Sequence, residues 1–115
     1  MKLASYLLDG YEKLAIYHDG YLYDLESIHG DLPNNMGVLL NFWEEYLPTL
    51  KSVNESVVKG TIARNLTMAV NDHRLLAPVP HPSSCRDGYA FSQHVAAARR
   101  NRKVEMIPEF YQYPI

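Results

Sequence analysis

The sequence contains one cysteine, no long apolar run and no excess of basic residues. Cys85 alone excludes an internal disulfide and fits a reducing compartment. No run approaches the roughly 18 apolar residues that a membrane span needs, and the net charge of −2 argues against a dedicated nucleic-acid binder. Residues 1–6 (MKLASY) alternate apolar and polar side chains, unlike a secretory leader. We therefore expect a cytoplasmic protein with neither a membrane nor a nucleic-acid partner.

Aromatic and aliphatic residues are plentiful despite the short length. The 115 residues are 47% apolar and include nine Tyr, three Phe and one Trp, enough buriable surface to argue against global disorder. A chain of this size forms one small domain at most and leaves little room for a deep, walled pocket. The length therefore argues against a complete enzyme.

The first 25 residues have the pattern of a β meander. Apolar and aromatic segments at residues 3–8, 13–17 and 21–25 are separated by Asp9-Gly10 and Asp19-Gly20. Asp-Gly favours type I′ hairpin turns, because both central residues need a positive φ. Two strands alone would be marginally stable, so a helix should cover one face of this sheet.

Residues 39–50 have the 3.6-residue apolar period of a helix. Pro48 cannot donate to the carbonyl four residues earlier, so we expect this helix to end or kink near Tyr46. A second helix is predicted from Asn54, which can cap it, with Gly60 weakening its middle. The expected fold class is α+β: a small antiparallel meander with one or two helices.

The composition changes after residue 74. Pro78, Pro80 and Pro82 alternate with other residues, which predicts an extended linker. A helix is expected from about Asp87 to the basic run at residues 99–103, followed by an apolar, aromatic tail. We therefore expect an N-terminal α+β domain at residues 1–74 and a second, incomplete region at residues 75–115.

One spacing in the second region suggests chemistry. If a helix runs through Asp87, Phe91 and His94, all three lie on one face, with the α-carbons of Asp87 and His94 about 10 Å apart. Such a carboxylate and imidazole could serve two sides of one bound molecule, the first holding a metal and the second acting on substrate. From spacing alone, a helix cap is the more ordinary role for Asp87, and a half-buried, carbonyl-bonded histidine for His94.

The other reactive side chains are better explained by structural roles than by functional ones. His18, His29, His73 and His81 fall in turns or loops, and no two share metal-ligand spacing on one element. Arg86 is the only thiolate-stabilising neighbour expected for Cys85. The basic run at residues 99–103 is more often a solvated helix end than an anion site.

Several short segments of the sequence resemble segments of a known protein family. The strings LLAPVP (75–80) and RDGYAFSQHV (86–95) resemble the start of the catalytic region in the fumarylacetoacetate hydrolase family. AARRNR (97–102) and MIPEF (106–110) are also similar to bacterial members, and the similarity over residues 1–74 is looser. The resemblance implies a hydrolase that cleaves carbon–carbon bonds in small diketo acids, such as acylpyruvates, with a bound divalent cation.

The family's roles carry over at individual positions. Asp87 matches a metal-ligand aspartate, His94 the histidine that activates water, and Tyr89 a substrate-contacting tyrosine. Arg102 or Arg100 matches an arginine that holds substrate oxygens in some members. The implied cofactor is Mg²⁺ or Ca²⁺, hard cations that prefer oxygen ligands.

The chain also departs from the family pattern. No Glu-x-Glu pair follows His94, although the family uses one to complete its metal site. We therefore expect a truncated chain that binds the cation weakly and is inactive when isolated. The alternative is a non-catalytic binding or assembly module that pairs with a separate catalytic chain. The apolar residues Phe110, Tyr111, Tyr113 and Ile115 would either be exposed or be buried in an oligomer such as a homodimer.

Overall fold

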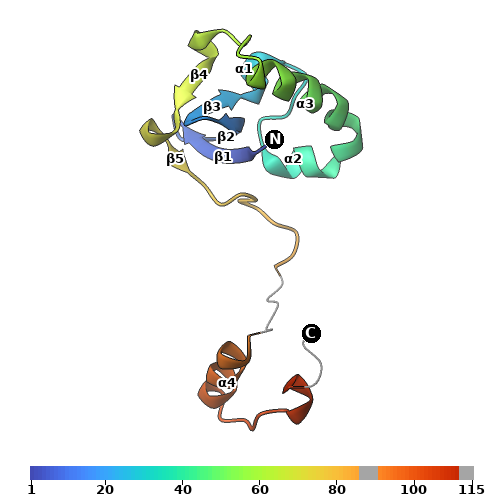
Figure 1. The fold of residues 1–115 in the computed structure, drawn as a ribbon, viewed down its shortest axis with the longest axis vertical. Helices are drawn as coiled ribbons and strands as arrows, with labels where there is room; N and C mark the ends of the chain where they lie inside the picture. The colour runs from blue at the N-terminus through green and yellow to red at the C-terminus, as the bar shows by residue number, and fades with distance from the viewer. Residues whose placement is uncertain (86–90, 112–115) are drawn as a thin grey trace. The chain divides into compact units, whose positions relative to one another are not determined.

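The computed structural model describes residues 1–85 and 91–111 of the chain. These divide into two compact units, Met1–Pro82 (the first unit) and Ser83–Ile115 (the second unit). The first unit combines an antiparallel sheet with helices, so the expected α+β class is confirmed. Figure 1 shows its helices α2 and α3 together beside the sheet. Residues 75–82, which the sequence assigned to the second region, belong to the first unit.

The predicted meander forms the centre of the sheet. Its strands are β1 (Leu3–Leu8), β2 (Tyr11–His18) and β3 (Tyr21–Asp24), paired antiparallel in sequence order. Both connecting turns have positive φ at their two central residues: 51° and 85° at Asp9-Gly10, and 46° and 85° at Asp19-Gly20. This is the backbone that a type I′ turn requires, so the Asp-Gly prediction is confirmed at both positions.

Two short outer strands extend the meander into a five-stranded sheet of order β4-β3-β2-β1-β5. They are β4 (Thr67–Ala69), against β3, and β5 (Arg74–Leu75), against β1. One continuous stretch of chain thus pairs with both outer strands of the meander. Between its two strands lies the short 3₁₀ helix η2 (Val70–Asp72), and a further one, η1 (Arg64–Leu66), precedes β4.

The two faces of the sheet bury different sets of side chains. Leu14 and Ile16 of β2 point to the larger core, while Ala15 between them joins a second cluster on the opposite face. This follows from the period of two along a strand. The larger core is completed by helical and loop side chains: Leu25, Leu32, Met36, Leu39, Leu50, Val53 and Val57. The second cluster contains Tyr6, Ala15 and Leu22.

Three helices contribute side chains to the larger core: α1 (Leu25–Ile28), α2 (Met36–Asn41) and α3 (Trp43–Val58). The helix does not end near Tyr46, because α3 continues through this residue, and the helical path is interrupted instead at Phe42, where φ is −120° and ψ is 35°. Pro48 lies inside α3. The bond that it cannot make would reach the carbonyl of Glu44, and both residues are exposed, so water can take the place of the missing donor.

The second predicted helix is also wrong, since Asn54 lies inside α3 rather than capping a new helix. The helix ends at Val58, and Gly60, just after its C-cap Lys59, has a φ of +67°. The Gly60 amide donates to the Val57 carbonyl at 3.0 Å and the Thr61 amide to the Ser56 carbonyl at 3.0 Å. These two bonds define a Schellman motif, so Gly60 terminates the helix that it was expected to weaken.

The proline-containing segment runs along β1 at its start. The Leu76 amide donates to the Ser5 carbonyl at 2.9 Å, and the Ser5 hydroxyl donates to the Pro78 carbonyl at 3.0 Å. Val79 packs against the larger core. The segment is therefore anchored to the first unit through Val79.

The second unit contains α4 (Ser92–Asn101) and the 3₁₀ helix η3 (Pro108–Tyr111). Val95 of α4 is fully buried, and it is the one buried side chain among those described in this unit.

Candidate functional site

Helix α4 contains two of the five residues to which the resemblance gives a role, His94 and Arg100, and a third, Arg102, is its C-cap. Its N-cap is Phe91, in extended backbone with φ −76° and ψ 120°, and no side chain caps the helix. The expected helix from Asp87 through Phe91 to His94 is therefore wrong at Phe91, which is extended. Asp87 and Tyr89 lie outside the described residues, so their distances to His94 are not part of the structure.

His94 is exposed in the first turn of α4, next to the buried Val95. The expectation of a half-buried histidine is wrong. Arg100 is exposed in the last turn, and Arg102, also exposed, is the C-cap. Arg100 lies six positions after His94, a rise of about 9 Å along the helix axis. The helix thus presents an imidazole near one end and two guanidinium groups at the other.

The C-terminal end of α4 is fixed by backbone bonds. Lys103 has a φ of 57°, and its amide donates to the Arg100 carbonyl at 3.0 Å. The Val104 amide donates to the Arg99 carbonyl at 3.1 Å, which completes a Schellman motif. The Arg99 side chain donates in turn to the Glu105 carbonyl. Arg99 is therefore used to hold the chain after the helix, and Arg100 and Arg102 are the exposed arginines of the basic run.

No three His, Cys, Asp or Glu side chains lie close enough to hold a metal ion in residues 1–85 and 91–111. A Mg²⁺ or Ca²⁺ site needs about six oxygen ligands. The described residues do not form such a site, and the one matched ligand, Asp87, falls outside them. The divalent cation therefore remains a proposal that depends on the resemblance.

The sequence predicts that four histidines lie on the surface, in loops and turns. His18, His29 and His81 each have a carboxylate nearby, with nitrogen–oxygen distances of 3.4 Å to Asp19, 3.9 Å to Asp31 and 3.6 Å to Glu12. The partially buried His73 is different, because its ring meets the ring of the fully buried Tyr6 edge to face, with centroids 5.8 Å apart.

Tyr6 and Asp24 form a buried polar pair beside His73. The Tyr6 hydroxyl donates to Asp24 Oδ2 at 2.6 Å, and Asp24 Oδ1 accepts from the Ser27 amide at 2.8 Å, capping α1. Burial, and next the bond to the Asp24 carboxylate, raise the pKa of the Tyr6 phenol far above its ordinary value. The sequence reasoning missed this group. Its members come from β1, the end of β3 and the segment before β5, and no linear spacing connects them.

Comparison of the chain with protein-family models, with curated proteins and with solved structures finds no match. Among the described helices, none combines the length and the apolar character that crossing a bilayer requires.

Proposed function

We propose that the chain is the N-terminal part of a fumarylacetoacetate-hydrolase-like enzyme, which hydrolyses a carbon–carbon bond in a small diketo acid. Residues 1–74 would form its N-terminal α+β domain, and residues 75–115 the beginning of its catalytic domain. The observation that carries the proposal is the resemblance of residues 75–80 and 86–95 to the start of that catalytic region. The exposure of His94 and Arg100 on α4 and of Arg102 at its C-cap supports it, because all three must reach substrate or water.

Each of the residues to which the resemblance gives a role would have a separate part in the reaction. His94 would accept a proton from the attacking water at a ring nitrogen, while the hydroxyl adds to a carbonyl carbon. The carbon–carbon bond then breaks, and the departing carbon takes up the proton. Arg100 or Arg102 would bind the substrate carboxylate, for which a guanidinium has matching paired donors. Asp87 would be one ligand of a divalent cation, which when bound polarises the diketone oxygens.

The test begins with the coding sequence. We expect the reading frame to continue past codon 115 and to encode a Glu-x-Glu pair and a later aspartate. A stop codon directly after Ile115 would overturn the proposal. In the longer chain, Mg²⁺-dependent hydrolysis of acetylpyruvate is expected to fall by about 10²–10⁴-fold in His94→Ala. His29→Ala, a matched change of an exposed histidine in the first unit, is expected to leave kcat unchanged.

The isolated 115-residue chain provides a second arm. We expect no Mg²⁺-dependent turnover, because the described residues contain no metal cluster and Asp87 alone supplies too few ligands. Turnover by this chain that is lost in His94→Ala would show that the enzyme does not need further ligands.

The alternative function is an assembly module that pairs with a separate catalytic chain. One observation favours it: Phe91 is 83% exposed and Val104 48% exposed, in a unit whose described residues bury one side chain. Exposed apolar groups of this kind often mark contact surfaces. A stop codon after Ile115, together with a defined oligomer in light scattering, would favour the module. A monomeric chain at 100 µM, a concentration on the order at which weak self-association becomes visible, would count against homodimers.

A further inference from the structure

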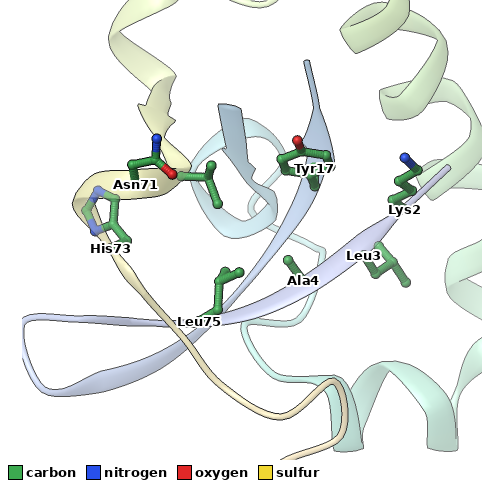
Figure 2. A pocket seen from close by; sticks show the side chains of 8 residues that line it. Lys2, Leu3, Ala4, Tyr17, Asn71, His73 and Leu75 are labelled. Atoms are coloured by element: carbon green, nitrogen blue, oxygen red, sulfur yellow. The ribbon is translucent and has the colours of Figure 1, made fainter. Parts of the chain in front are cut away.

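The first unit contains a cavity of about 610 Å³ beside the second cluster of buried side chains. It lies between the start of β1, the end of β2 and the segment that leads into β5. Figure 2 shows Lys2 and Tyr17 on one side, Asn71 and His73 on the other, and Ala4 and Leu75 between them. The volume is typical of small-molecule sites, which usually occupy about 300–1,000 Å³.

Local sequence explains why this space is open. The Tyr17 amide bonds to the Lys2 carbonyl at 2.8 Å, so two long side chains stand side by side at one end of the strand pair. The next pair on the same face is Ala4 opposite Ala15. Their methyl groups project only a short way from the sheet, and Ala4 forms the floor of the cavity. The long side chains of Lys2 and Tyr17 beside these two alanines leave a hollow in the surface of the sheet.

The opposite wall is held from both ends. The Val70 amide donates to the Gly20 carbonyl at 2.9 Å, and β5 pairs with β1. Within this wall, the His73 ring packs on Tyr6, whose hydroxyl is fixed by the buried Asp24. The walls are therefore positioned before any ligand arrives, which lowers the entropic cost of binding.

The polar groups around the cavity favour an anion. The Lys2 ammonium lies 5.7 Å from the centre of the Tyr17 ring, and the Asn71 amide and the His73 imidazole add donor capacity across the cavity. Among the described residues, no Asp or Glu side chain lines it. The rest of the lining, including Ala4 and Leu75, is apolar.

We propose that this cavity binds a small carboxylic acid with a compact aliphatic or aromatic body. The carboxylate lies near Lys2 and accepts donors from the rim, and the apolar body packs on Ala4 and Leu75. The site shares no residue with the proposed hydrolase site in the second unit, so either proposal can fail alone.

A neighbouring cavity of about 240 Å³ also touches Lys2 and Tyr17. It contains the carboxylate of Asp19, which would repel a bound anion. Ala4 lines the larger cavity and not the smaller one, so a substitution at Ala4 distinguishes the two.

The test is a titration of the isotopically labelled 115-residue chain with hexanoate and with benzoate, followed by amide NMR. The affinity tag is placed at the C-terminus, which leaves Met1 and Lys2 unaltered. We expect saturable shifts at the amides of residues 2–4 and 70–75, with a dissociation constant on the order of 1 mM. Hexanol and benzyl alcohol, which lack the charge, are expected to bind about tenfold more weakly.

Substitutions test separately the contribution of the Lys2 charge and the need for open space above Ala4. Lys2→Met keeps the aliphatic stem and is expected to weaken hexanoate binding about tenfold. Lys51→Met, which removes one charge from the exposed face of α3, is the matched control and is expected to change nothing. Ala4→Leu is expected to fill the floor and abolish binding of both acids.

The proposal is overturned by any of three results: no saturation, equal binding of the alcohols, or unchanged affinity in Lys2→Met. Shifts that saturate in Ala4→Leu as in the parent chain would place the ligand elsewhere and would overturn it as well. Lys2→Met keeps the proposal open to refutation if Ala4→Leu does not fold, because Lys2 is exposed and its replacement alters no core packing.

Discussion

Each of the two units of the chain is stabilised internally in a different way. The first buries two clusters of apolar side chains on opposite faces of a five-stranded sheet, and its buried polar residues Tyr6 and Asp24 are hydrogen-bonded to each other. In the described part of the second, Val95 is the one buried side chain, and local backbone bonds define the helix and its end. Long-range burial stabilises the first unit, whereas local bonding dominates what is described of the second.

The largest expected effect is on the core of the first unit. Leu14→Ala removes a fully buried side chain and should lower the free energy of unfolding by about 2–5 kcal/mol. Urea unfolding followed by Trp43 fluorescence measures this, because Trp43 is the single tryptophan and packs against the larger core. Val95→Ala, in the second unit, should leave that transition unchanged. A large shift in Val95→Ala would show that the two units unfold together.

The next effect concerns the buried pair. Tyr6→Phe leaves one oxygen of Asp24 without its donor and should cost about 1–3 kcal/mol in the same unfolding experiment. Tyr11→Phe is the matched control, since Tyr11 is 73% exposed, and it should cost almost nothing. Equal effects of the two substitutions would mean that the Tyr6–Asp24 bond does not stabilise the first unit.

The same substitution also has a pH signature. The pKa of Tyr6 is raised in the folded chain, so above the unfolded value of 10.0 the unfolded state loses this proton while the folded state keeps it. The stability that Tyr6 contributes is thus complete below pH 10 and declines above it, by up to about 1.4 kcal/mol per pH unit. The difference in unfolding free energy between the parent chain and Tyr6→Phe should therefore shrink between pH 10 and 11. A constant difference would contradict the shift.

The smallest effects concern the two Schellman motifs, one at each main helix. Gly60 and Lys103 both adopt a positive φ, which suits glycine and disfavours lysine. Gly60→Ala should destabilise the first unit by about 1 kcal/mol, and no neighbouring atom would clash with the added methyl group. Lys103→Gly should stabilise α4 by roughly 0.5–1 kcal/mol, measured as slower amide exchange in that helix. Faster exchange would mean that the lysine side chain holds the helix end.

The parts of the fold that sequence predicts are those with local causes. The two Asp-Gly turns and the apolar strands around them need no distant partner to be recognised. The strands β4 and β5 have three and two residues, too few to show any period, and they exist because the edges of the meander accept them. The interruption at Phe42 has no marker in the sequence, while Pro48 gave a misleading one.

The candidate site shows the same division. The spacing of Asp87 and His94 has a geometric meaning only if the helix passes through Phe91, and Phe91 is extended. An argument from helical spacing depends on where the helix begins, and α4 has no capping side chain to mark that position. The roles of these residues therefore depend on the resemblance. The cavity beside His73 could not be found from spacing at all, because three separate segments build it.

The pairing of β5 with β1 has a topological consequence. The chain begins the first unit along β1 and, after the helices, returns antiparallel to that same strand, with Pro78 bonded to Ser5. The first strand of the unit is therefore hydrogen-bonded to the segment with which the unit ends. A module of this kind can join a longer polypeptide through one narrow attachment region, as an appendage that need not be threaded through its host.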